Sequence, residues 1–275
     1  MSHAISVCHG EFGRAAIYKL DRSIVTHAHR EGHLIFYVGG STAVVPVGEA
    51  HNTVDPDFAV AVSPWAPHSF HPEDADEACL CLTLYIKPLW FREKSRTAPL
   101  SLKFGRAHLR VTPALSAWIK RLTALLLEDA NRAEFDGMLH EITQLCFEMS
   151  WDGVRQSAQL ELACGRFTDF RVRRSLRLMQ ENYAEEVEMR HLARDVGLSR
   201  PHFFKLFKKQ MGVTPNVYLN TLRSEQAIDD LLNTRKSVTD IAYDLGFSSQ
   251  ASFTRFFASN VGIAPSEYRR VAHIS

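Results

Sequence analysis

The chain has 275 residues, enough for two domains of ordinary size, each with its own hydrophobic core. Hydrophobic residues make up 45% of the sequence and charged residues 23%, which is typical of a soluble globular protein. No apolar run approaches the roughly 20 residues of a membrane helix. The N-terminal segment has no secretory pattern and the five cysteines form no CxxC pair, so we expect a cytoplasmic protein with reduced thiols and no membrane partner.

The net charge of +1 conceals an asymmetry along the chain. Residues 1–165 contain 15 Lys and Arg against 19 Asp and Glu, whereas residues 166–275 contain 17 against 12. A basic C-terminal part is compatible with an anionic partner such as nucleic acid. Since many domains reach this charge without such a partner, the class of protein has to be argued from motifs.

The first 86 residues contain short apolar runs separated by Gly, Pro, Asn and Asp. Examples are "HLIFYVGG", "STAVVPVG" and "ACLCLTLYI". Short strands at this spacing indicate an antiparallel β-barrel or β-sandwich.

Between Thr112 and Trp151 the hydrophobic period changes to that of a helix. Pro113 suits a helix start, and "DANRAEFD" predicts a break between two helices. We expect both helices to pack on the barrel and to contribute to a homodimer interface. The apolar positions that recur every three or four residues are Leu115, Trp118, Leu122 and Leu125, then Met138, Ile142, Leu145 and Met149.

Residues 156–168 have mixed composition and are predicted to link a first domain, 1–155, to a second, 169–275. The second domain is predicted to be entirely helical, and it contains an internal repeat. One copy reads "MRHLARDVGLSRPHFFKLFKKQMGVTPNVYL" from Met189, and the other "VTDIAYDLGFSSQASFTRFFASNVGIAPSEYR" from Val238. Gly197 pairs with Gly246 at an offset of 49 residues. At an offset of 50, Phe203, Phe207, Gly212, Pro215 and Tyr218 pair with Phe253, Phe257, Gly262, Pro265 and Tyr268.

Each copy has the features of a helix-turn-helix. In the first, an amphipathic helix stops at Gly197, which tolerates the left-handed turn conformation. Ser199 is placed to cap the next helix through its hydroxyl, and Pro201 falls in that helix's first turn. The second copy repeats the pattern with Gly246 and Ser248.

A long amphipathic helix is predicted between the two copies, from Asn216 to Asn233. At 1.5 Å per residue it would be about 27 Å long. Successive major-groove faces on one side of B-DNA recur about every 34 Å. Such a rod could hold two recognition helices for adjacent groove segments.

Residues from about Phe170 to Arg270 resemble the paired helix-turn-helix domain of the AraC/XylS family of bacterial transcription regulators. The second copy, "DIAYDLGFSSQASFTRFFASNVGIAPSEYRR", is close to that family's signature. The resemblance implies a sequence-specific regulator of transcription, not an enzyme, that binds double-stranded DNA and acts on RNA polymerase. It also implies an N-terminal domain that binds a small-molecule effector and dimerises.

Base contacts are expected from exposed positions early in each recognition helix. Gln can pair with adenine through two hydrogen bonds and Arg with guanine, and methyl groups can touch thymine. The resemblance assigns base contacts to Gln250, Ala251 and Arg255. Phe204 should be exposed, because Phe203 and Phe207 already occupy the inward face. The predicted DNA-binding residues are Pro201, His202, Phe204, Lys205 and Lys208 in the first copy, and Gln250, Ala251, Ser252, Thr254 and Arg255 in the second.

Four histidines lie in two N-terminal segments that resemble the two motifs of cupin barrels. His27, His29 and His33 occur in "THAHREGH", and His68 occurs in "SPWAPHSF". The pattern departs from that of cupins, because His33 stands where the motif has a glutamate. Since side chains alternate along a strand, these imidazoles could face the barrel interior.

Three interpretations of the histidines remain open: a zinc-type metal site, polar groups that line an effector site, or buried structural residues. We favour an effector site and assign no cofactor. The rival function is a metal-dependent cupin enzyme fused to a DNA-binding domain, which needs an open coordination position. An architectural DNA-binding protein without effector would leave 165 residues unexplained. The predicted effector-binding residues are His27, His29, His33, Phe36, Trp65 and His68.

The predicted fold is therefore multidomain α+β. A cupin-like antiparallel β-barrel with trailing helices precedes an all-α domain with two helix-turn-helix units.

Overall fold

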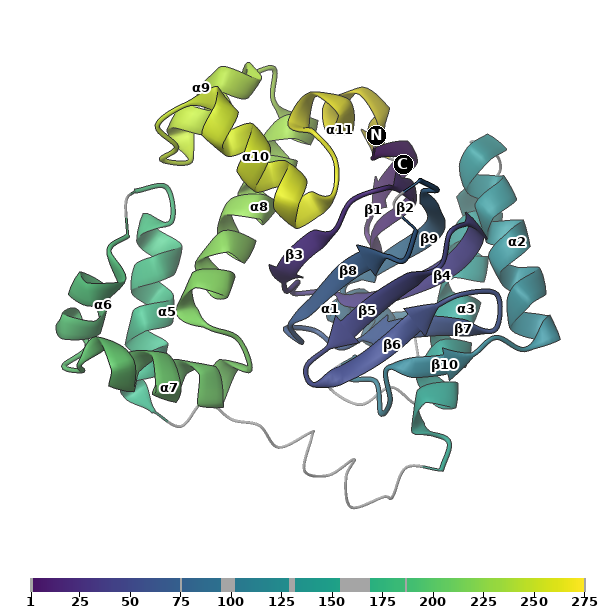
Figure 1. The fold of residues 1–275 in the computed structure, drawn as a ribbon, viewed down its shortest axis with the longest axis horizontal. Helices are drawn as coiled ribbons and strands as arrows, with labels where there is room; N and C mark the ends of the chain where they lie inside the picture. The colour runs from purple at the N-terminus through teal and green to yellow at the C-terminus, as the bar shows by residue number, and fades with distance from the viewer. Residues whose placement is uncertain are drawn as a thin grey trace.

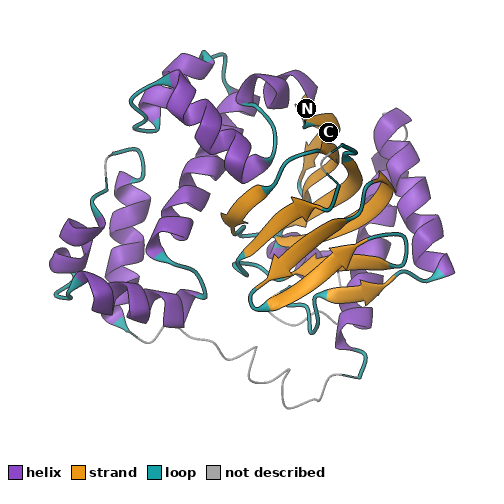
Figure 2. Cartoon of the chain, in the orientation of Figure 1, coloured by secondary structure: helices purple, strands orange, loops and turns teal. Residues whose placement is uncertain are grey.

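The computed structural model describes residues 2–74, 76–94, 102–128, 132–153, 169–185 and 187–274. The predicted linker, 156–168, lies outside these residues. The described chain forms a β-rich part followed by two long helices, and then a helical part (Figures 1 and 2). None of the described helices combines the length and apolar character needed to cross a membrane.

The strands form two sheets that share a hydrophobic core. One sheet has seven strands in the order β10-β7-β4-β9-β2-β1-β11, and the other has four in the order β3-β8-β5-β6. Within the described residues neither sheet closes on itself through hydrogen bonds, so the expected strands are confirmed and a closed cupin barrel is not. The bounds are β1 (His3–Gly10), β2 (Gly13–Leu20), β3 (Ile24–His27), β4 (Gly32–Gly40), β5 (Ala43–Val47), β6 (Ala50–Val54), β7 (Phe58–Val62), β8 (His68–Pro72), β9 (Cys79–Ile86), β10 (His108–Arg110) and β11 (Ala272–Ile274).

The seven-stranded sheet is covered on both faces. Because side chains alternate along each strand, neighbouring residues enter different cores. On β4, Ile35 faces the core between the two sheets, whereas Leu34 and Phe36 face a second core under the helices. These helices are α1 (Pro88–Lys94), α2 (Pro113–Glu128) and α3 (Arg132–Trp151). The predicted helix pair is thus confirmed, and its apolar faces pack on the sheet. A dimer contact through α2 and α3 stays a prediction.

The helical part contains two helix-turn-helix units joined by one long helix. The first unit is α6 (Met189–Asp195) with α7 (Arg200–Met211), and the second is α9 (Val238–Asp244) with α10 (Gln250–Val261). The connecting helix α8 (Pro215–Asn233) has 19 residues, close to the prediction. Helix α5 (Phe170–Asn182) precedes the first unit and α11 (Pro265–Val271) follows the second.

The turns follow the predicted backbone conformation, but the predicted serine caps are only partly right. Gly197 and Gly246 have φ values of +74° and +76°. Pro201 lies in the first turn of α7, as expected. Ser199 occupies the N-cap of α7 without a side-chain hydrogen bond, and the N-cap of α10 is Ser249 instead of Ser248.

The C-terminal part is not wholly helical, contrary to expectation. Residues Ala272–Ile274 form β11, which pairs in parallel with β1 at the edge of the seven-stranded sheet. A strand of three residues is too short to show a period-2 pattern, and its pairing depends on an edge that only the folded sheet provides.

The second unit shares a core with the sheets. Tyr268 of α11 is completely buried, and its hydroxyl accepts a hydrogen bond from Nη1 of Arg14 at 3.1 Å. Nε2 of His9 lies 2.7 Å from the same oxygen. The first unit has a separate core, which Ala28 joins from the loop after β3. The two units therefore contact the N-terminal domain through different surfaces (Figure 1).

Candidate functional site

The recognition helix of the second unit, α10, has one buried and one exposed face. Phe253 and Phe257 are completely buried, whereas Gln250, Ala251 and Arg255 are exposed. The hydroxyl of Thr239 donates to Oε1 of Gln250 at 2.7 Å and so restricts that side chain.

Two other predicted positions on α10 are half-buried, Ser252 and Thr254. The hydroxyl of Ser252 donates to the carbonyl of Ser249 at 2.8 Å, within the cap of the helix. Ser252 therefore has a local structural partner as well as its predicted place at the interface.

On the recognition helix of the first unit, α7, Pro201, His202, Lys205 and Lys208 are exposed. Phe204 is half-buried, so the expectation of an exposed ring is wrong. The ring packs against the core of the first unit, and the Arg200 guanidinium lies 5.0 Å from its centroid. The inward stripe is thus wide enough to include part of Phe204.

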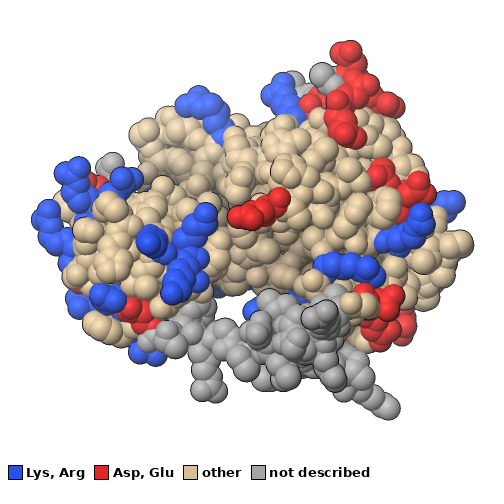
Figure 3. All heavy atoms as spheres, turned by 60° about the horizontal axis from the view of Figure 1, so that its bottom comes forward, with Lys and Arg blue, Asp and Glu red and all other residues tan. Residues whose placement is uncertain are grey.

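The positive charge is concentrated on the first unit. Residues 166–211 contain eleven Lys and Arg against six Asp and Glu, whereas residues 212–275 contain six of each. Figure 3 shows these side chains spread over the lobe formed by α5, α6 and α7. This difference between the two units was not expected from the charge of the whole second half. The exposed basic residues are Arg173, Arg174, Arg177, Arg190, Arg194, Arg200, Lys205, Lys208 and Lys209.

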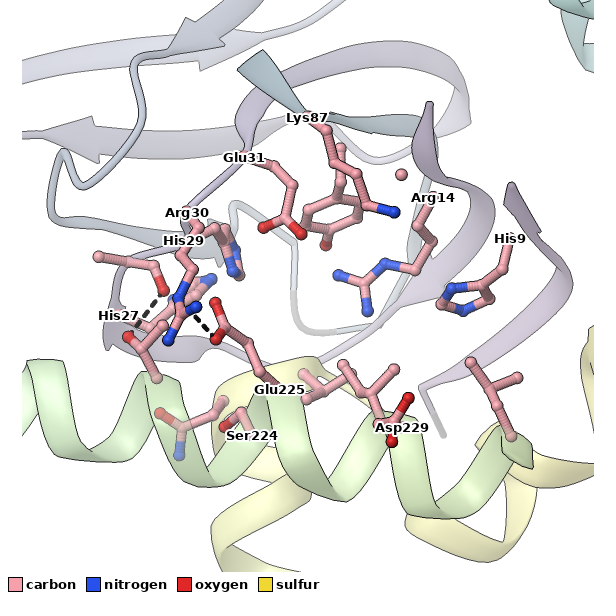
Figure 4. Close-up of a pocket in the computed structure, with 18 of the residues that line it drawn as sticks. His9, Arg14, His27, His29, Arg30, Glu31, Lys87, Ser224, Glu225 and Asp229 are labelled. Atoms are coloured by element: carbon pink, nitrogen blue, oxygen red, sulfur yellow. Dashed lines mark hydrogen bonds and ion pairs between the residues drawn. The ribbon is translucent and has the colours of Figure 1, made fainter. Parts of the chain in front are cut away.

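A cavity of about 580 Å³ lies between the N-terminal domain and α8. Figure 4 shows Ser224, Glu225 and Asp229 of α8 opposite the strands and loops of the N-terminal domain. The wall of that domain includes Arg14, His27, His29, Arg30, Glu31 and Lys87. A ligand in this cavity would contact both domains at once.

One carboxyl group in the cavity has an altered acidity. Burial raises the pKa of Glu225 to about 7, although the neighbouring Arg30 opposes this shift. Nε of Arg30 lies 2.9 Å from the Glu225 carboxylate, an ion pair between the β3–β4 loop and α8.

Of the predicted effector-binding residues, only His27 and His29 line this cavity. His33 and His68 lie deeper, where they and His27 line a cavity of about 20 Å³, room for about one water molecule. Effector binding by the predicted residues between the sheets stays a prediction, and this small cavity does not support it.

The two aromatic residues of the predicted site lie elsewhere. Trp65 stacks on Tyr218 of α8, with ring centroids 5.0 Å apart. Phe36 is three residues from His33 on β4, so strand alternation places it on the opposite face, under the helices. Arg14, Lys87 and Glu225 were missed, because they meet in the cavity from separate elements and share no motif.

The four imidazoles are nevertheless brought together. The ring centroids of His27 and His68 are 4.3 Å apart, and those of His29 and His68 are 5.1 Å apart. Burial lowers the pKa of His27 to about 4 and holds the pKa values of His29, His33 and His68 well below the usual value. The rings are therefore neutral at pH 7.

Comparison with known proteins connects this architecture to a family. Residues 192–271 match the family model described as a helix-turn-helix domain. The virulence regulon transcriptional activator VirF of Yersinia enterocolitica is 32% identical over 181 residues, which cover 65% of this chain and 62% of the relative. The HTH-type transcriptional activator RhaS of Citrobacter koseri is 25% identical over 256 residues, which cover 92% and 90%.

A structure of ToxT from Vibrio cholerae matches with a TM-score of 0.56 and 14% identity, covering 94% of this chain and 97% of that one. At this identity the match shows a shared fold alone. The alignment with VirF spans less than two thirds of that relative's length. VirF and RhaS are both named as transcriptional activators, in agreement with the expectation of a regulator instead of an enzyme. Residues 192–271 thus form a helix-turn-helix domain, and the chain is similar to transcriptional activators such as VirF and RhaS.

Proposed function

We propose that this protein binds specific DNA sequences and activates transcription through contact with RNA polymerase. We further propose that it acts as a homodimer controlled by a small-molecule effector. The observation that carries the proposal is the pair of helix-turn-helix units on one 19-residue helix, each with an exposed recognition face.

The two units have different roles in this proposal. The second unit reads bases, since Gln250 and Arg255 are exposed and can each make paired hydrogen bonds to a purine. The first unit, with its excess of basic side chains, supplies phosphate contacts that position the protein on the duplex.

The effector is proposed to bind in the cavity under α8 instead of between the two sheets. Its volume of about 580 Å³ is within the range of ligand sites, roughly 300–1,000 Å³. A ligand that contacts both α8 and the N-terminal domain favours one arrangement of the two over another. Effector binding would thereby change how the two units engage DNA.

The test starts from fragments of random DNA selected by the full-length protein, with and without candidate metabolites. Arg255→Ala is expected to cost about 1–3 kcal/mol at the selected site and to relax specificity at one base pair. Lys208→Ala is the matched control. Loss of an exposed lysine that contacts a phosphate is expected to weaken binding to all sequences equally. Absence of any sequence preference at moderate salt would refute the proposal.

A further inference from the structure

The four histidines form a closed cluster of donors at the junction of the two sheets and α8. Nitrogen atoms of His27, His29 and His68 all lie within 4.8 Å of one another. His33 adds a fourth nitrogen, since its Nδ1 lies 3.1 Å from Nε2 of His68. The metal-type group found there among the described residues contains imidazoles alone, without a carboxylate or a thiol.

Counting protons shows which ring nitrogens of this cluster are bare. A neutral imidazole carries one N–H and one bare nitrogen. Nδ1 of His27 lies 2.8 Å from the Val25 carbonyl, and Nδ1 of His68 lies 3.0 Å from the Ala66 carbonyl. Both rings must donate there, which leaves Nε2 bare in each.

The remaining two rings supply one donor, from His33 to His68. Because Nε2 of His68 is bare, Nδ1 of His33 must donate to it, and Nε2 of His33 is then bare too. Nε2 of His33 and Nε2 of His29 are both buried without a hydrogen-bond partner in the described structure. Unpartnered buried nitrogens are costly in a folded protein, and a cation at the centre would satisfy them.

We propose that His27, His29 and His68 bind one divalent transition-metal ion of the zinc class, with His33 as a neighbouring fourth nitrogen. Neutral imidazole suits zinc, copper, nickel and cobalt, whereas magnesium and calcium require oxygen ligands. The hydrogen bonds from His27 and His68 to backbone carbonyls are those that fix the orientation of metal-binding histidines.

The cluster has to contract to hold such an ion. Zinc–nitrogen bonds of about 2.0–2.1 Å in a tetrahedron place ligand nitrogens roughly 3.3–3.4 Å apart. The candidate atoms of His27, His29 and His68 lie within 4.8 Å of one another, so they must move closer together, and Nε2 of His68 must exchange its 3.1 Å hydrogen bond from His33 for the bond to the ion. The adjoining cavity of about 20 Å³ leaves room for one small ion or water molecule.

Arg14 is a buried cation near the cluster, and an aromatic ring separates the two. Its guanidinium lies 3.6 Å from the centroid of Tyr85, and the ring of His33 stacks on Tyr85 at 4.3 Å. Two groups centred over one ring must occupy opposite faces, so Tyr85 stands between Arg14 and His33.

The site is joined directly to the helix that carries both DNA-binding units. The carbonyl of Ala28, between two of the ligands, accepts a hydrogen bond from the Thr221 hydroxyl of α8 at 2.9 Å. The carbonyl of His29 accepts another from the backbone N–H of Trp65 at 2.7 Å, and Trp65 stacks on Tyr218 of α8. A metal ion would therefore fix the loop on which α8 rests, a consequence that rests on the proposed function.

The test uses full-length protein stripped with EDTA and titrated first with Co²⁺ and then with Zn²⁺. We expect one Co²⁺ per chain with the visible absorption of a tetrahedral nitrogen site, displacement by one Zn²⁺, and a higher melting temperature with either ion. His29→Gln is the mildest variant, because the buried Nε2 has no partner to lose. It should weaken binding at least tenfold, and His68→Gln should abolish it. His51→Gln, at an exposed position on β6, should bind like the parent.

Three results would overturn the site: no Co²⁺ spectrum with the folded parent protein, equal binding by the parent and His29→Gln, or loss of binding in His51→Gln. Because His29→Gln removes no observed hydrogen bond at Nε2, it keeps the test decisive should His68→Gln not fold. None of these titrations contains DNA. Failure of the metal site is thus distinguishable from failure of the regulator proposal, which the DNA selection tests separately.

Discussion

The equivalent tyrosines of the two repeats allow a matched test of how the second unit is anchored. We expect Tyr268→Phe to lower the free energy of unfolding by about 2–4 kcal/mol. A hydrogen bond to a charged group contributes about 1.5–3 kcal/mol and a neutral one about 0.5–1.5 kcal/mol. The Tyr268 hydroxyl meets both the Arg14 guanidinium and His9, so its removal leaves a buried cation without that acceptor.

Tyr218→Phe is the control, because Tyr218 occupies the same position in the first unit and is 2% exposed. Its hydroxyl accepts from Nε2 of Gln180 at 3.0 Å, a neutral hydrogen bond. We therefore expect a loss of only about 0.5–1.5 kcal/mol. Urea denaturation followed by circular dichroism measures both. Equal losses in the two variants would show that the Arg14–Tyr268 hydrogen bond between the domains is no stronger than the neutral Gln180–Tyr218 hydrogen bond, and would refute the reasoning.

Three further measurements examine the turns, the cavity and the interface. Gly246→Ala should destabilise the protein far more than Gly197→Ala, for which the positive φ alone costs about 1–2 kcal/mol. An added Cβ at Gly246 lies 2.3 Å from the Ala184 carbonyl oxygen, whereas one at Gly197 meets nothing within 4 Å. Similar melting temperatures for the two variants would contradict this. Because burial raises the Glu225 pKa to about 7, parent stability should fall as pH rises from about 4.5 to 7, by at most about 3 kcal/mol, and Glu225→Gln should lack this loss. If the difference in free energy of unfolding between the parent and Glu225→Gln stays constant with pH, the raised pKa of Glu225 is refuted. Lys208→Ala should reduce the slope of log affinity against log salt by about 1, and an unchanged slope would show that Lys208 touches no phosphate.

Local and repeated features were predictable from the sequence. The helix-turn-helix units follow from Gly197 and Gly246, which need a left-handed backbone, and from aromatic pairs four residues apart that fix the inward face. The helices α2 and α3 follow from their hydrophobic period. In each case the signal depends on residues near one another in the chain.

The predictions that the structure does not bear out concern places where distant elements meet, with one exception that follows from strand alternation. Strand alternation alone excludes Phe36 from a site with His33, because an odd separation puts them on opposite faces. By contrast, β11 and the cavity under α8 depend on how the second unit packs on the sheets, which leaves no pattern in the sequence. The half-buried Phe204 reflects Arg200 and the core of its own unit, a tertiary effect on a position that helical period leaves undecided.

The two units have the same order of helices but are held in different ways, and this difference bears on control. The second unit shares a core with the sheets and is joined to them by β11 and by the contact of Tyr268 with Arg14. The first unit and α8 meet the N-terminal domain at the Ala28 loop, through Ala28 itself, the Thr221 hydrogen bond and the Arg30–Glu225 ion pair. Polar contacts near a cavity are easier to rearrange than a continuous apolar core, because water can replace them at a smaller cost. The cavity under α8 is also lined by Asn260 and Val261 of α10, so a ligand there should change how α8 and the second unit sit on the N-terminal domain, and with them the spacing of the two recognition helices.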